Sequence, residues 1–180
     1  MLVLKFRKKQ FSSPFYKLFV VNGILGLSAK GLFGHLFNFT VITSGHPQFI
    51  GNINLFESQH FVVGLLGVHR SIVTSNKLEK ATDLCSSNTQ LVHTPGPMPD
   101  SVSVLAKNVP GMGTVAITGA LFIQDDNLKR VDFPFVWNQD LLFDSRKRII
   151  CMSDWLIPGH SVPIPVTRQL KMNAGCSRHL

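Results

Sequence analysis

Residues 43–52 of the chain read T-S-G-H-P-Q-F-I-G-N. The preceding stretch, residues 37–42, is rich in apolar and β-branched side chains, which is typical of a buried strand. The quoted segment is therefore predicted to form a loop at the end of a strand, where proteins often carry their binding residues. His46 supplies the only imidazole of this loop.

Three further motifs follow downstream, each containing a glycine and a proline or a threonine-glycine pair. They read H-T-P-G-P at residues 93–97, T-G-A-L-F at residues 118–122 and I-P-G-H at residues 157–160. The first belongs to a proline-dense turn, which we expect to be stiff. The last motif again ends in a histidine, His160. Each motif alone is weak, but four of them in one order are informative.

Together the four motifs resemble the zinc-binding signature of the metallo-β-lactamase superfamily. In that family they read T-H-x-H-x-D-H-x-G-N, x-T-P-G-H-T, T-G-D-L-F and V-P-G-H. Their order and spacing agree with the family from about residue 37 to residue 166. The resemblance implies an α+β fold, the four-layer αββα sandwich, with the site along one edge. Only 45 residues precede His46, so we expect the N-terminal sheet to be shortened.

The resemblance also maps the metal ligands of the family onto this chain. The seven ligand positions are Ser44, His46, Gln48, Phe49, Pro97, Ala120 and His160. Only the two histidines are zinc ligands by type, and in the family they serve different metal ions. A catalytic zinc needs about three protein ligands besides its water. We therefore expect His46 and His160 to be remnant metal ligands, and no bound cofactor where the family uses zinc.

Two functions of different class remain open. One is a catalytically degenerate relative without zinc, which binds a partner or a former substrate. In that case His46 and His160 either flank its binding pocket, or they are ordinary side chains that are compatible with the fold and have no function. The alternative is a zinc-dependent hydrolase. Resemblance to a compact one-domain member of the family implies an endoribonuclease acting on histone pre-mRNA 3′ ends, and a homodimer. A duplicate without any function is the third interpretation.

Positive charge is concentrated near the start of the sequence. The chain has a formal net charge of +8, and residues 1–56 hold six basic side chains and no acidic one. A basic segment of this kind can bind nucleic acid, such as RNA, or an anionic membrane surface. The simpler interpretation is a solvated tail, because charged termini are usually mobile.

The same segment raises the question of targeting. An apolar run at residues 18–27 follows the basic start, and this order resembles a signal or transit sequence. The run is about half as long as a membrane span, so no span is expected. We favour a buried strand at residues 18–21 that ends in the Asn22-Gly23 turn. The expected location is the cytosol or the nucleus, with organellar targeting by residues 1–30 as the alternative.

The cysteines also bear on the compartment. Cys85, Cys151 and Cys176 are odd in number and widely spaced. This arrangement argues against a disulfide framework and favours a reducing compartment.

Hydrophobic periodicity predicts the other elements. A helix is expected at residues 140–153, with Arg146, Lys147 and Arg148 on its polar face. Strands are expected at residues 37–43, 61–67, 91–93, 101–107, 113–122 and 155–157. The chain is thus predicted to consist of a basic lead segment at residues 1–17, a metallo-β-lactamase-like domain at residues 18–166 and a disordered polar tail at residues 167–180.

Overall fold

The computed structural model describes residues 31, 37, 39–50, 53, 56, 58, 60–75, 78, 80–122, 136–159 and 161–176, with the side chains of Gln48 and Cys85 set aside. The chain forms two compact units, Met1–Lys77 and Leu78–Leu180. Strands and helices occur in both, so the α+β class is confirmed. His160 and the strand predicted at residues 18–21 lie outside the described residues, as does the basic segment.

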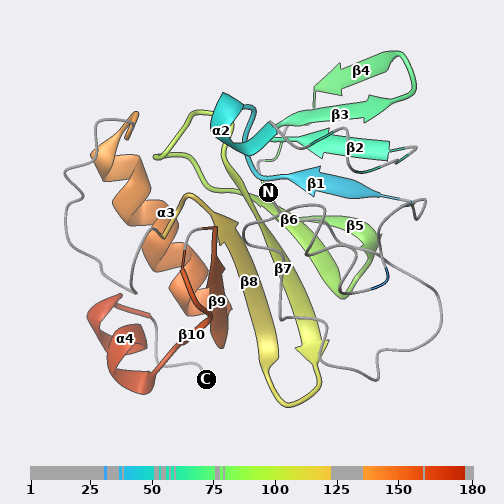
Figure 1. Cartoon of the computed structure of the whole chain (residues 1–180). Coiled ribbons are helices and arrows are strands. Elements are labelled where there is room, and N and C mark those ends of the chain that lie inside the picture. The colour runs from blue at the N-terminus through green and yellow to red at the C-terminus, as the bar shows by residue number, and fades with distance from the viewer. Residues whose placement is uncertain are drawn as a thin grey trace. The chain divides into compact units, whose positions relative to one another are not determined.

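In the first unit, a 4-stranded sheet has the order β1-β2-β3-β4 (Figure 1). β1 runs parallel to β2, and the other neighbours are antiparallel. The helix α2 is a single turn between β1 and β2. The elements span Thr40–Ile42 (β1), Pro47–Ile50 (α2), His60–Val63 (β2), Leu66–His69 (β3) and Ile72–Ser75 (β4).

The single strand predicted at residues 61–67 is wrong, because a turn divides this stretch into β2 and β3. Gly64 has a φ of 54°, a left-handed conformation that glycine adopts readily. Its N–H donates to the carbonyl of Ile42 at 2.9 Å, which fixes the turn beside the end of β1. The apolar run through Gly64 and Leu65 contains no polar residue, so its periodicity gives no sign of the turn.

The second unit contains a 6-stranded sheet in the order β10-β9-β8-β7-β6-β5 (Figure 1). Its strands span Thr82–Ser86 (β5), Thr89–His93 (β6), Val102–Val109 (β7), Gly113–Gly119 (β8), Trp155–Pro158 (β9) and Ile164–Pro165 (β10). β8 and β9 are parallel, whereas β6, β7 and β8 follow one another antiparallel. It follows that β6, β8 and β9 point the same way and that their carboxyl ends lie at one edge of the sheet.

β7 is buried on both faces at its start. Val102, Ser103, Val104 and Leu105 all have exposed fractions of 1% or less. The half-buried alternation predicted at residues 101–107 is therefore wrong for this end of the strand. The Ser103 hydroxyl is accommodated because it shares a hydrogen bond of 3.0 Å with the hydroxyl of Thr94.

The helix α3, Gln139–Met152, forms the predicted helix and packs against the sheet (Figure 1). Asn138 caps it, because the side-chain oxygen accepts from the N–H of Leu141 at 3.0 Å. Leu142, Ile149 and Ile150 join the main core cluster. Of the described helices, none is long and apolar enough to cross a membrane.

Arg146 does not lie on the polar face of α3, which corrects the prediction for residues 146–148. Its side chain is 3% exposed. The guanidinium donates to the carbonyl of Leu121 at 2.6 Å and lies 5.3 Å from the centre of the Phe122 ring. Arg146 is four residues after Leu142 and three before Ile149, so helical periodicity itself places it on the apolar face.

The expected disorder of residues 167–180 is also wrong for the described part of that segment. The helix α4, Arg168–Asn173, begins after Thr167, whose hydroxyl accepts from the N–H of Leu170 at 3.1 Å. Leu170 and Ala174 are buried and belong to the same core cluster as α3. The polar composition of this stretch concealed two apolar positions one helical turn apart.

Cys151 and Cys176 form a disulfide, contrary to the expectation from cysteine count and spacing. Their Cα atoms lie 5.4 Å apart although 25 positions separate them in the sequence. The expectation failed because the packing of α3 against α4 brings the two cysteines together, and their separation in the sequence does not reveal this.

Candidate functional site

The first candidate position is the loop that joins β1 to α2. Ser44 follows the strand and is 1% exposed. Its hydroxyl accepts a hydrogen bond of 3.3 Å from the backbone N–H of His46. The carbonyl of His46 in turn accepts from the N–H of Phe49 at 2.8 Å, which closes the single turn of α2. His46 is thus held half-buried in the loop that follows β1.

Phe49 stands where the resemblance would place a ligand histidine, and its ring is buried. The side chain is 5% exposed, and its ring meets the His46 imidazole edge-on with centroids 6.1 Å apart. Burial of a phenyl ring stabilises a fold by about 2–3 kcal/mol. This loop therefore keeps its shape through packing around Phe49, where the family would use a metal ion.

The second candidate position is the loop that follows β6 and contains Pro97. Gly96 has a φ of 134°, and a Cβ atom there would lie 2.3 Å from the Cα of Leu142. The loop backbone therefore touches α3 directly. Trp137 donates its N–H to the carbonyl of Pro97 at 3.1 Å, and Asn138 donates to that of Gly96 at 3.0 Å.

Two side chains farther along α3 also hold this loop. The Ser145 hydroxyl donates to the carbonyl of Pro95 at 2.7 Å. Arg148 donates to the carbonyl of His93, and the imidazole of His93 pairs with the carbonyl of Pro99 at 2.8 Å. These contacts fix the loop together with the backbone carbonyl of Pro97, and the Pro97 side chain, which has no donor atom for a metal, is buried.

The third candidate position, Ala120, follows β8, whose end lies beside the end of β9. The N–H of Gly159 donates to the carbonyl of Gly119 at 2.8 Å. A Cβ atom on Gly159 would lie 3.0 Å from that oxygen, so only glycine allows this approach without displacement. The described part of the I-P-G-H motif, residues 157–159, therefore lies beside the start of the T-G-A-L-F motif, and Ala120 is half-buried.

The structure thus brings together part of the predicted site. The loops that follow β6, β8 and β9 lie at one edge of the second unit's sheet, so Pro97, Ala120 and Gly159 share that edge. His46 belongs to the first unit. The family's arrangement would bring His46 and His160 close together at one edge of the sandwich, and this proximity stays a prediction.

The described donor set does not fit a family-type zinc site. Among the described ligand positions, His46 offers an imidazole and Ser44 a hydroxyl, whereas Phe49, Pro97 and Ala120 offer no donor atom in their side chains. A hydroxyl must lose its proton to bind zinc well, and the Ser44 oxygen already accepts a hydrogen bond. Among the residues that the structure describes, no three His, Cys, Asp or Glu side chains gather closely enough to hold a metal ion.

Sequence reasoning missed the contribution of α3 to this region. Arg146 binds the carbonyl of Leu121, directly after Ala120, and Ser145 binds the loop that contains Pro97. The position of Arg146 on the apolar face was a usable signal. The sequence contained no signal for the role of the Ser145 hydroxyl, because serines are common on helix surfaces.

The fold of the chain is similar to that of a solved structure. The chain is similar to the protein TTHA1623 solved in a di-iron-bound form, with a TM-score of 0.54 and 18% identity over 89% of this chain and 86% of that one. No family model matches the chain. The chain has the α+β fold of the metallo-β-lactamase superfamily, and its resemblance to that superfamily is confirmed.

Two curated proteins are similar to the chain in sequence. Metallo-beta-lactamase domain-containing protein 1 of Xenopus laevis is 27% identical over 133 residues, which cover 71% of this chain and 55% of that protein. An uncharacterised protein of Caenorhabditis elegans is 28% identical over 155 residues, which cover 84% of this chain and 43% of that protein. The chain therefore spans about half the length of the curated relatives that it matches.

Proposed function

We propose that the chain is a metallo-β-lactamase-fold protein that binds a partner or former substrate without metal-dependent hydrolysis. The observation that carries this proposal is the donor set. Five ligand positions have described side chains, and His46 is the only zinc-type ligand among Ser44, His46, Phe49, Pro97 and Ala120. One imidazole does not retain zinc against water, since family-type sites use three or four ligands per ion.

The packing of the replacement residues supports the same proposal. Phe49 is buried in the first unit, and Pro97 is buried beneath contacts from α3 in the second. A metal-dependent site that had merely lost its ion would leave polar ligands pointing into an empty space. Here the loops are stabilised by apolar packing and backbone hydrogen bonds, so they keep their shape without an ion.

RNA is the partner class that we propose. The chain has a net charge of +8, and the first 30 residues contain six basic side chains. Neutralising phosphates with such side chains releases counterions, which drives association with nucleic acid. The alternative function is a zinc-dependent endoribonuclease acting on histone pre-mRNA 3′ ends. The resemblance of the motifs to a compact one-domain member of the family is the reason for this alternative and for the proposal of a homodimer. The sequence similarity to metallo-beta-lactamase domain-containing protein 1 supports the resemblance itself.

Metal content separates the two functions. We expect the purified full chain to contain far less than one zinc per chain by elemental analysis after dialysis, and to leave a labelled histone pre-mRNA 3′ end uncut. Stoichiometric zinc that is lost in His46→Ala would overturn the proposal. Cleavage that a chelator abolishes and added zinc restores would favour the endoribonuclease instead.

RNA binding is tested through its dependence on salt. If residues 1–30 neutralise about five phosphates of a single strand, log Kd should vary with log salt with a slope of about 3–4. Deleting residues 1–10 removes four basic side chains, Lys5, Arg7, Lys8 and Lys9, and should flatten the slope. Binding that does not respond to salt would contradict the proposed arm.

We also propose a location in the cytosol or the nucleus. The apolar run at residues 18–27 is interrupted by Asn22 and by two glycines, which weakens it as a targeting core. Residues 1–30 fused to a fluorescent reporter should therefore leave the reporter in the cytosol. An organellar or secreted signal would support the targeting alternative.

A further inference from the structure

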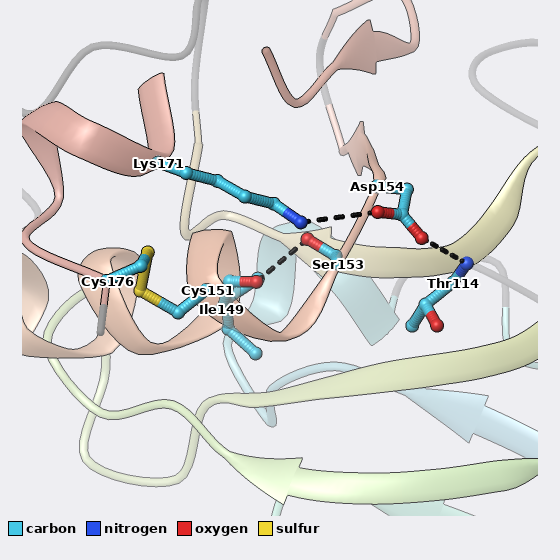
Figure 2. Close-up of polar contacts among 7 residues, drawn as sticks. All are labelled: Thr114, Ile149, Cys151, Ser153, Asp154, Lys171 and Cys176. Atoms are coloured by element: carbon cyan, nitrogen blue, oxygen red, sulfur yellow. Dashed lines mark hydrogen bonds and ion pairs between the residues drawn. A yellow bond between two sulfur atoms is a disulfide. The ribbon is translucent and has the colours of Figure 1, made fainter. Parts of the chain in front are cut away.

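The last described segment of the chain, residues 164–176, is attached to the second unit by a small set of contacts that we call the C-terminal clasp. β10 pairs with β9, and Val166 donates its N–H to the carbonyl of Asp154 at 2.8 Å. Lys171 forms an ion pair with Asp154 at 3.2 Å, and the Cys151–Cys176 disulfide closes the clasp (Figure 2).

The non-covalent part of the clasp is limited: its apolar contacts with the core are those of the buried Leu170 and Ala174, with Ile164 and Val166 partly buried beside them. α4 has 6 residues, and helices shorter than about 12 residues are unstable without tertiary support. The Asp154 side chain is 52% exposed, so its ion pair with Lys171 is screened by water and contributes little. Asp154 also accepts from the N–H of Thr114 at 2.9 Å, so it remains in place without Lys171 (Figure 2). The disulfide adds a covalent cross-link to this limited set of contacts, so we expect it to control how often the clasp opens.

We propose that Cys151 and Cys176 form a thiol–disulfide exchange site, with protein or small-molecule dithiols as its reductants, and that reduction opens the C-terminal clasp. Both cysteines are half-buried at the edge of the core cluster, so an incoming thiolate can approach them. The chemistry balances as two exchange steps. A reductant thiolate attacks one sulfur and breaks the S–S bond; its second thiolate then resolves the mixed disulfide. Cys151 and Cys176 leave as thiolates and take up two protons, and the reductant becomes the disulfide.

Opening the clasp changes the surface around α3. Leu170 and Ala174 belong to the cluster that includes Ile149 and Ile150, so release of α4 exposes part of this apolar face. Cys151 lies in the last turn of α3, and Ser153 ends that helix with a hydrogen bond of 2.7 Å to the carbonyl of Ile149 (Figure 2). The same helix holds the loops after β6 and β8 through Ser145 and Arg146. The redox state of the pair thus acts on the element that supports the candidate site.

Limited trypsin digestion tests the proposal, because Arg168 and Lys171 are cleavage sites inside α4. The full chain is first equilibrated with oxidised or reduced dithiothreitol, and free thiols are counted. We expect the oxidised protein to have two reactive thiols fewer than the reduced protein. Cleavage after Lys171 should become faster by about tenfold or more on reduction, since loss of a cross-link raises the open population. The double variant C151S/C176S should be cut quickly in both buffers.

Cys85→Ser serves as the matched control, because it removes the third cysteine and leaves the pair intact. It should keep the full response to reductant. Equal cleavage rates of the oxidised and reduced wild type would overturn the proposal, as would an unchanged thiol count. Neither result bears on the zinc content of the chain, so the clasp and the proposed function fail independently.

Discussion

Gly96 shows how a single missing Cβ atom brings a loop against a helix. Its φ of 134° is one that other residues rarely adopt, and a Cβ would meet the Leu142 backbone at 2.3 Å. We expect Gly96→Ala to reduce the free energy of unfolding by about 3 kcal/mol or more, because neither strain nor overlap can relax without moving α3. Urea unfolding measures this value.

Gly111→Ala is the matched control for this change. Gly111 also has a positive φ, 72°, but no heavy atom lies within 4 Å of the position that a Cβ would take there. The control isolates backbone strain and should cost about 1 kcal/mol. Equal losses in the two variants would show that the contact between Gly96 and Leu142 does not constrain the loop.

Arg146 joins α3 to the turn after β8. We expect Arg146→Ala to destabilise the fold by about 2–4 kcal/mol, because the buried carbonyl of Leu121 loses its donor and the Phe122 ring loses a packing partner. Lys147→Ala is the neighbouring control. It removes only the contact between Lys147 and the exposed Phe143 ring, so it should lower the free energy of unfolding by less than about 1 kcal/mol. Thermal or urea unfolding of both variants checks the difference. A loss for Arg146→Ala no larger than that of the control would contradict the assigned role.

At the scale of elements, the amino-terminal cap of α3 gives a third prediction. Asn138→Ala removes the oxygen that accepts from the N–H of Leu141, and we expect a loss of about 1 kcal/mol. Asn138→Asp keeps an acceptor at the same place and should restore most of the stability. If both variants lose the same amount in urea unfolding, the cap does not contribute as described.

Elements with a clear hydrophobic period were predicted from the sequence, and elements defined by tertiary contacts were not. α3 and the hairpin of β7 and β8 appear at the expected positions because their apolar pattern and their turn residues agree. The turn at Gly64 was missed because its flanking residues are uniformly apolar. α4 was missed because only Leu170 and Ala174 reach the core, and two positions make no recognisable period.

At the scale of the whole molecule, the motifs predicted the part of the site that parallel strands bring together. The parallel strands β8 and β9 end side by side, and the N–H of Gly159 donates to the carbonyl of Gly119 there. The two motifs that contain these glycines were expected at the same edge of the sheet. The cysteine pair was not predictable, because its proximity depends on how α4 packs on α3. The proximity of His46 to His160 stays a prediction, because only the resemblance of their motifs to the family supports it.

Zinc should leave the stability of the full chain unchanged. A ligand that binds only the folded state stabilises it by about 2.7 kcal/mol at a concentration one hundred times its Kd, so even weak binding would raise Tm measurably. With one imidazole at His46 and no side-chain donor at Phe49, Pro97 or Ala120, we expect no change in Tm at zinc concentrations that saturate family-type sites. Differential scanning calorimetry with zinc and with a chelator checks this. His46→Ala provides the control: a zinc-dependent rise in Tm that this variant abolishes would show that the loop after β1 still binds metal, and the non-hydrolytic assignment would then be wrong.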